Sequence, residues 1–242
     1  MSTHDDSAAR RTAGALHELA LASAGLLGAG DVIGMTTSLL AGCTRATGAS
    51  AAGMVVVRPD DGRLELLAST SHRAHELELY LLQVDEGPWV DAVRARTAVA
   101  VSGSQQIASR WPSVTHALQR AGYQAVYAAP MMWRGEALGA LNLFFRDEGS
   151  ADEIGEVAQM FADLVTLAIV HSGGVTGADL ADRFRAALDE RIVIERAKGV
   201  LAYVENVPFD EAFELLLALA GDTGEPLGEV AARIIDNAVA AD

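Results

Sequence analysis

Apolar positions follow two different periods along this chain, and the change between them falls near residue 172. Before that point, segments with apolar residues three or four apart alternate with short β-branched runs, a pattern typical of helices alternating with strands. After it, only the helical spacing occurs. The pattern predicts an N-terminal α+β region, in which helices flank a mainly antiparallel sheet, followed by a C-terminal region of helices alone.

The N-terminal region begins with a polar stretch, residues 1–12, which we expect to form a disordered tail. Asp31 is placed to cap a helix, and the tetrad Pro59-Asp60-Asp61-Gly62 is a turn signal between two strands. The predicted strands cover residues 54–58, 63–70, 98–101, 124–133 and 137–145, and the predicted helices cover 13–27, 32–46, 75–83, 89–96, 108–120 and 152–171.

The C-terminal region follows a glycine-rich linker, predicted over residues 173–178. A long helix reaches from about Leu180 past Leu201 and is broken at Asn206-Val207-Pro208. A second helix is expected over Phe209–Ala220, and Pro226 is placed to open a third. We therefore expect an α+β domain over residues 13–172 and a small three-helix bundle over residues 179–242.

Composition identifies a globular chain, with 50% hydrophobic and 21% charged residues. The formal charge of −15 opposes contact with nucleic acid or anionic membranes unless positive side chains are gathered on one surface. Cys43 is the only cysteine, which excludes an intrachain disulfide and a cysteine zinc site. Because Cys43 falls in an apolar helical stripe, we expect it to be buried rather than reactive. These features, with no signal peptide evident, favour the cytoplasm.

The most apolar run, residues 160–170, is shorter than the roughly 20 residues that span a bilayer, so no membrane segment is expected. The run is apolar almost all round, and such a helix must be covered on more than one face. One face of a sheet does not supply both covers. A second copy of the chain, in a homodimer, is the expected remaining cover.

No pattern for catalysis emerges from the sequence. Metalloprotease, Walker and nucleophile-elbow motifs are absent, and the acidic pairs fall in turns or in the tail. His72 and His75 share a helix face, but a solvated face is the more frequent meaning of such a pair than a metal site. Redox chemistry would need thiols that this chain lacks. We therefore predict no catalytic residues, no metal and no cofactor, and a protein that is not an enzyme.

The N-terminal region resembles a bacterial GAF domain. The resemblance is carried by Leu82-Gln83-Val84-Asp85-Glu86-Gly87-Pro88-Trp89, Ser109-Arg110-Trp111-Pro112, Gly122-Tyr123-Gln124 and Leu138-Gly139-Ala140-Leu141-Asn142-Leu143. GAF domains are sensory modules, so the resemblance implies an unidentified small-molecule or protein ligand. Trp89, Trp111 and Tyr127 are candidate pocket residues, with core packing as the alternative role. The cysteine that attaches a tetrapyrrole in some relatives has no counterpart here.

The C-terminal region resembles the ANTAR domain. The matching segments are Ala187-Leu188-Asp189-Glu190-Arg191, Ile194-Glu195-Arg196-Ala197-Lys198-Gly199-Val200-Leu201, Asp210-Glu211-Ala212-Phe213-Glu214-Leu215-Leu216 and Leu227-Gly228-Glu229-Val230-Ala231. ANTAR domains are three-helix output modules that bind paired RNA hairpins, usually as dimers, and prevent a transcription terminator from forming. A GAF domain followed by an ANTAR domain is a familiar bacterial arrangement, which implies a signal-responsive antitermination regulator.

The resemblance makes Arg191 and Lys198 the first candidates for RNA contact, and Lys198 is the only lysine of the chain. The two lie seven residues apart, so they project from one face of a helix. Arg196, Gly199 and Tyr203 complete the candidate set, Tyr203 as a stacking surface for bases and Gly199 as a point of close approach.

The ANTAR-like region departs from its family in charge. Between residues 173 and 242 there are six basic and fourteen acidic side chains, and several positions that are basic in relatives are not basic here. Phosphate contacts normally supply much of the affinity for nucleic acid. An alternative function is therefore a protein-interaction or adaptor module whose degenerate ANTAR domain no longer binds RNA.

Overall fold

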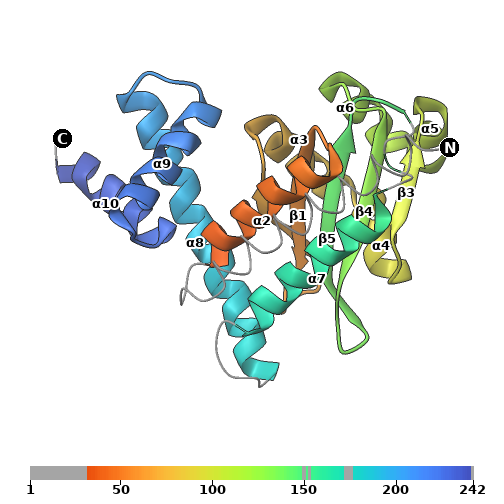
Figure 1. The fold of residues 1–242 in the computed structure, drawn as a ribbon, viewed down its shortest axis with the longest axis horizontal. Helices are drawn as coiled ribbons and strands as arrows, with labels where there is room; N and C mark the ends of the chain where they lie inside the picture. Colours follow the sequence, from red (N-terminus) through yellow and green to blue (C-terminus); the bar gives the residue numbers. More distant parts are fainter. Residues whose placement is uncertain (1–31, 149–150, 152–153, 172–176, 241–242) are drawn as a thin grey trace, which may run out of the picture.

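The computed structural model describes residues 32–148, 151, 154–171 and 177–240 (Figure 1). The predicted tail and the predicted helix over residues 13–27 lie outside the described residues. The strands are β1 (Ala51–Val57), β2 (Leu64–Ser69), β3 (Val99–Ser102), β4 (Ala125–Trp133) and β5 (Glu136–Phe145). The helices are α2 (Val32–Thr47), α3 (His72–Val84), α4 (Pro88–Ala95), α5 (Ser104–Arg110), α6 (Pro112–Ala121), α7 (Gly155–His171), α8 (Gly177–Val204), α9 (Phe209–Thr223) and α10 (Leu227–Ala240).

The strands form one antiparallel sheet in the order β2-β1-β5-β4-β3. Alternation along β4 divides its side chains between the two faces: Tyr127 packs with α2 and α7, whereas Val126 packs with α3, α4 and α6. Gly139 allows the close pairing of β5 with β1, since a Cβ there would lie 2.1 Å from the carbonyl oxygen of Val55. The sheet is therefore covered by helices on both faces, as predicted for an α+β domain.

The last three helices form a bundle beside this domain (Figure 1). Pro208 stands directly before α9, and Asn206, with a φ of 53°, turns the chain between α8 and α9. Gly228 of α10 permits close contact with α8, because a Cβ there would lie 2.3 Å from Oε1 of Glu190. The N-terminal half of α8 reaches back along the α+β domain, so the two regions share a continuous apolar core. The predicted fold class is confirmed.

Two element predictions need correction. The helix predicted over residues 108–120 is two helices, because Pro112 lacks an amide hydrogen and disfavours helical geometry at Trp111, where α5 ends and α6 begins. In addition, α8 begins at Gly177, inside the predicted linker.

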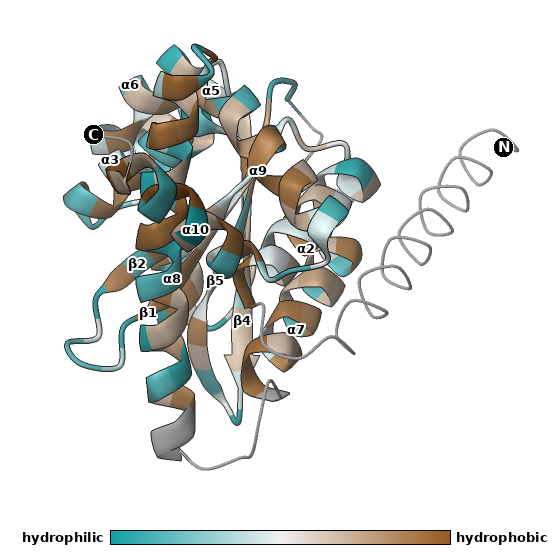
Figure 2. Ribbon diagram, turned by 90° about the vertical axis from the view of Figure 1, so that its left-hand side faces the viewer, coloured by the Kyte–Doolittle hydropathy of each residue, from teal (hydrophilic) through white to brown (hydrophobic). Residues whose placement is uncertain are grey.

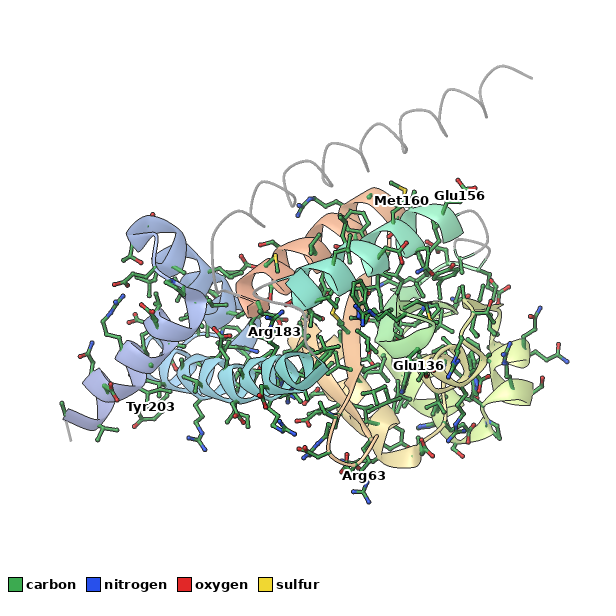
Figure 3. The ribbon with its side chains drawn as sticks, turned by 90° about the horizontal axis from the view of Figure 1, so that it is seen from below. Arg63, Glu136, Glu156, Met160, Arg183 and Tyr203 are labelled. Atoms are coloured by element: carbon green, nitrogen blue, oxygen red, sulfur yellow. The ribbon has the colours of Figure 1, made fainter. Side chains whose placement is uncertain are left out.

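The apolar run 160–170 has a cover that was not predicted, helix α2 of the same chain. In the structure α7 lies against both α2 and the sheet, so most of its surface is covered within one chain. Met160 and Leu167, 40% and 41% exposed, remain open on its outer side (Figure 3). The homodimer stays a prediction.

The elements differ in the hydropathy of their residues. Helix α7 is largely apolar, whereas the turn between β1 and β2 is polar (Figure 2). Within the described ranges, no helix combines the length and the apolar character needed to cross a membrane.

Candidate functional site

The five residues expected to contact RNA lie on two different faces of α8. Arg191 and Lys198 point toward the α+β domain and are largely buried. Arg196 and Tyr203, also seven residues apart, lie on the opposite, exposed face. The structure therefore brings the candidates together as two groups rather than as one surface.

Arg191 is held by strand β2. Its Nη1 donates a hydrogen bond to the carbonyl oxygen of Leu66 and lies 3.7 Å from Oε1 of Glu65. The side chain is only 15% exposed, and burial lowers the pKa of the guanidinium, partly offset by the nearby carboxylates of Glu195 and Glu65. An arginine engaged in this way is not available to a phosphate.

Lys198 is held within its own bundle, at the boundary with the α+β domain. Its Nζ donates to both carboxylate oxygens of Glu195, at 2.9 and 3.0 Å, and lies 5.0 Å from the ring centre of Phe213. The residue is 6% exposed. Glu195 thus occupies Lys198 from one helical turn before it, a pairing that the spacing i, i+3 permits.

His75 of α3 faces the same carboxylate from the other domain, with its Nδ1 3.8 Å from Oε1 of Glu195. Burial is the main cause that lowers the pKa of His75; the charges of Arg191, Lys198 and His72 add to the lowering, and Glu195 opposes it. This lowering favours the neutral form of the ring. The ring packs against the ion pair as a small polar group rather than as a second cation.

The start of α3 also meets α9. The amide nitrogen of His72 donates to Oδ1 of Asp210 at 2.5 Å, and the His72 ring stacks on Phe209 with ring centres 4.9 Å apart. A solvated face was the favoured prediction for His72 and His75, with a metal site as the alternative, and neither prediction includes these contacts with α8 and α9. In the described ranges no group of three or more His, Cys, Asp or Glu side chains is placed to hold a metal. In the structure His75 contacts α8, and His72 contacts α9.

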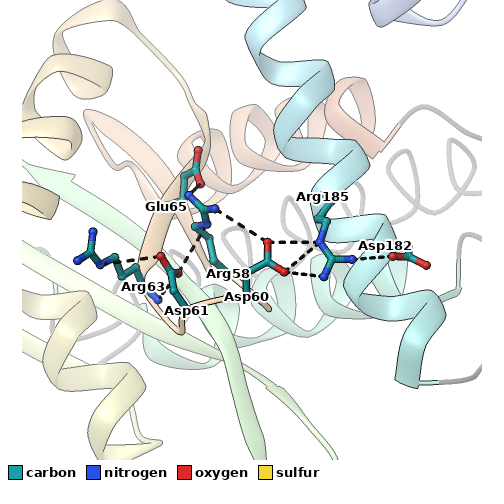
Figure 4. Close-up of polar contacts among 7 residues, drawn as sticks. All are labelled: Arg58, Asp60, Asp61, Arg63, Glu65, Asp182 and Arg185. Atoms are coloured by element: carbon teal, nitrogen blue, oxygen red, sulfur yellow. Dashed lines mark hydrogen bonds and ion pairs between the residues drawn. The ribbon is translucent and has the colours of Figure 1, made fainter.

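A further contact joins the turn between β1 and β2 to the start of α8 (Figure 4). Nη2 of Arg185 donates to Oδ1 of Asp60 at 2.6 Å, and Nε lies 3.1 Å from the same oxygen. The hydrogen bond from Arg185 is the main cause that holds the pKa of Asp60 below its ordinary value. Asp182 and Arg58 flank the pair on either side. Because solvent screens this ion pair, it orients α8 against the hairpin and adds little to the free energy of folding.

The opposite face of α8 is open. Tyr203 is 88% exposed near the end of the helix that is remote from the sheet (Figure 3), and Ile192 and Arg196 are also exposed. Among the described residues nothing lies within 4 Å of a Cβ added at Gly199. Packing among the described residues therefore does not explain a glycine at a position where it costs about 1 kcal/mol relative to alanine.

The three candidate pocket residues do not share one cavity. Trp89 lines a cavity of about 1050 Å³ between α3, α4 and the turns of the sheet. Trp111 is buried in the same core cluster, where its Nε1 donates to Oδ2 of Asp91 at 3.1 Å. Tyr127 lies on the other face of the sheet, with its hydroxyl donating to the carbonyl oxygen of Gly155. Cys43 is buried, as expected, and burial raises the pKa of its thiol to about 12.

Solved structures with a similar fold include GAF domains. The GAF domain of an Acinetobacter phosphoenolpyruvate-protein phosphotransferase matches with a TM-score of 0.53 and 14% identity, over 73% of this chain and all of that one. The GAF domain of the corresponding Coxiella burnetii protein matches with a TM-score of 0.51 and 15% identity, over 66% and 94% of the two chains. At such identities the likeness is one of fold. No curated protein matches significantly.

Family models divide the chain as its architecture does. The model described as a GAF domain matches residues 29–170, more than half of the chain, and the model described as an ANTAR domain matches residues 182–235, which lie in α8, α9 and α10. Both are sensor or regulatory domains rather than catalytic ones. The chain therefore belongs to the GAF domain family and, through its ANTAR domain, to the GAF–ANTAR regulators.

Proposed function

We propose that this protein is a cytoplasmic, homodimeric regulator whose GAF domain controls the binding of tandem RNA hairpins by its ANTAR domain, and that this binding antiterminates transcription. The observation that carries the proposal is the position of Lys198. This lysine lies within the ANTAR match and, with Arg191, at the boundary between the two domains. A cation placed there can be released or withheld by movement of the GAF domain.

The pairing of the basic side chains in the ANTAR domain supports control of RNA binding by separation of the two domains. At the boundary Arg191 is paired with Glu65, and Lys198 is paired with Glu195. Elsewhere Arg185 is bound to Asp60, and Arg233 is bound to Glu225. Among the described basic side chains of this domain, only Arg196 has no such partner. Binding to RNA depends on phosphate neutralisation by several cations, so this closed arrangement binds RNA weakly. Separation of α8 from β2 and α3 frees Arg191 and exposes the Lys198–Glu195 pair to solvent, where a phosphate can compete for the lysine. Both cations then add to Arg196.

The experiment is an electrophoretic shift assay of the full-length chain with tandem hexaloop hairpins at low salt. The variant His75→Glu places a carboxylate opposite Glu195, where like charges repel, and this favours the open arrangement. We expect RNA affinity to rise by about tenfold. His116→Glu is the matched control, because His116 is exposed on α6 and makes the same change in net charge.

Adding Lys198→Ala to His75→Glu is expected to remove most of the gain, since one of the released cations is lost. If neither the wild type nor His75→Glu binds the hairpins at any salt concentration, with candidate GAF ligands present or absent, the proposal fails. Equal affinity of His75→Glu and His116→Glu would refute the closed arrangement as the source of control.

The excess of fourteen acidic over six basic side chains favours a second candidate, an adaptor that captures a protein through the ANTAR domain. This function predicts capture of a partner protein in ribonuclease-treated extract, unchanged in the double variant Arg191→Ala, Lys198→Ala. The RNA-binding function predicts that the same double variant loses hairpin binding.

A further inference from the structure

A cavity lies at one end of the GAF sheet. It is bounded by α3, α4, the turn between β1 and β2, and the turn between β4 and β5, and it measures about 1050 Å³. Protein sites for small molecules typically measure about 300–1,000 Å³. Leu79, Leu82, Val90 and Val93 supply an apolar wall. The space is large enough for an organic molecule with an apolar body.

Guanidinium groups are concentrated around this cavity, in a chain whose formal charge is −15. Arg63, Arg94 and Arg96 line it, together with the carboxylates of Asp85 and Glu136. Nη2 of Arg94 is 2.9 Å from Asp85, and Nη2 of Arg96 is 2.5 Å from Glu136. Each pair is exposed on both sides, so the arginines can exchange these carboxylates for the anionic group of a ligand.

The wall behind this space is closed by Trp89, which is fully buried. Its indole ring supports the apolar side of the cavity from the core and is not itself exposed to a ligand.

The rim of the cavity includes the ends of α3 and α4. Asp85 and Arg96, which end these helices, have φ values of 48° and 56°, the left-handed conformation in which helices commonly end. The two helix ends bring one acidic and one basic side chain to the cavity.

We infer that this cavity binds a small organic anion: an apolar body against α3 and α4, with a carboxylate, sulfonate or phosphate group held by Arg94 and Arg96. The site is defined by the GAF domain alone.

The position of the cavity connects it to α8, and this consequence rests on the proposed function. Gly62, Arg63 and Leu64 form part of its wall. In the same hairpin, Asp60 contacts Arg185 (Figure 4), and Glu65 contacts Arg191. A ligand that displaces this hairpin therefore weakens the contacts that hold the ANTAR domain closed, and RNA affinity rises.

The test uses two fluorescent probes that differ by one sulfonate: 1-anilinonaphthalene-8-sulfonate, an anion, and N-phenyl-1-naphthylamine, its neutral analogue. Their fluorescence is titrated with the full-length chain in the absence of RNA. We expect the anion to bind at least about tenfold more tightly, as charge-assisted hydrogen bonds to arginine require.

Paired variants then move the affinity in opposite directions. Arg94→Gln with Arg96→Gln should lower the affinity for the anionic probe by about tenfold or more. Asp85→Asn with Glu136→Gln should raise that affinity, because both arginines lose their carboxylate partners. Arg120→Gln, on the exposed face of α6, is the control and should leave the affinity unchanged.

Equal affinity of the two probes, or equal weakening by Arg120→Gln and by the cavity variants, would overturn the inference and leave adventitious adsorption as the explanation. Probe binding does not depend on RNA, so a chain that never binds hairpins can still show this anion selectivity. Loss of the proposed function and loss of this site are thus distinguishable.

Discussion

Two buried ionisable side chains, Glu78 in the GAF core and Lys198 at the domain boundary, show two different uses of burial. Glu78 is completely buried under α3 and receives a hydrogen bond from Nδ2 of Asn142 at 2.8 Å. Burial raises the pKa of its carboxyl to about 8, although the bond from Asn142 lowers it. Lys198 instead lies against a carboxylate and an aromatic ring.

The difference lies in what each surrounding can do. Glu78 is enclosed by one domain, and Gly53 leaves the room it needs, since a Cβ there would lie 2.2 Å from Oε1 of Glu78. Releasing it means unfolding the domain. Lys198 is covered by elements of both domains, which can separate while each remains folded. The first group is part of the architecture, and the second is suited to a switch.

The largest expected effect concerns Glu78 and the pH dependence of stability. Unfolded Glu78 loses its proton near its ordinary pKa of 4.5, while the folded protein keeps that proton until about pH 8. Between these values unfolding releases a proton, so raising the pH destabilises the fold, by up to about 1.4 kcal/mol per pH unit. Glu78→Gln should abolish this dependence in chemical denaturation at a series of pH values.

Glu76→Gln provides the comparison for that experiment, because Glu76 is exposed on the same helix. It should retain the wild-type slope between pH 4.5 and pH 8. A slope that survives in Glu78→Gln would show that another group is responsible.

The next effect tests the boundary. Lys198→Ala leaves the carboxylate of Glu195 partly buried without its main partner, and should lower the free energy of unfolding by about 1–3 kcal/mol. Arg196→Ala, on the exposed face of α8, should change it by less than about 0.5 kcal/mol. Urea denaturation of the two variants measures the contrast, and equal losses would contradict the division of α8 into two faces.

Gly199→Ala is expected to produce a smaller effect with an unusual sign. The added Cβ meets no atom within 4 Å, so the variant should gain about 0.5–1 kcal/mol of stability from helix propensity. If RNA or a second copy approaches this face closely, hairpin affinity should fall in the same variant. A variant that is more stable and binds hairpins as well as the wild type would leave the glycine without a role in binding.

The smallest effect concerns the exposed contact of Asp60 with Arg185. Asp60→Arg should raise hairpin affinity less than His75→Glu does, because solvent screens the repulsion. Adding Arg185→Asp restores opposite charges and should return the affinity toward the wild-type value in the same shift assay. Failure of the double variant to reverse the effect would exclude this contact from the control of α8.

Much of this organisation is local and was therefore predictable. The β-branched runs became the strands, the breaks at Asn206 and Pro226 separate the three C-terminal helices, and Cys43 is buried in its stripe. Motif spacing also placed Arg191 and Lys198 on one helix face. The prediction of one helix over residues 108–120 was wrong because a proline divides that segment into two helices. The cover of α7 by α2 was not predicted because the two helices lie more than a hundred residues apart in the sequence.

The sequence by itself determined the fold class, the order of the two domains and the helical position of the candidate cations, because periodicity, capping and turn chemistry act over a few residues. Only the tertiary structure decided which way those cations face. Arg191 meets Glu65 and Leu66 across 125 residues, and His75 meets Glu195 across the domain boundary. Whether a charge binds a phosphate or an internal carboxylate depends on such distant neighbours, because burial and pairing are set by packing and not by local spacing.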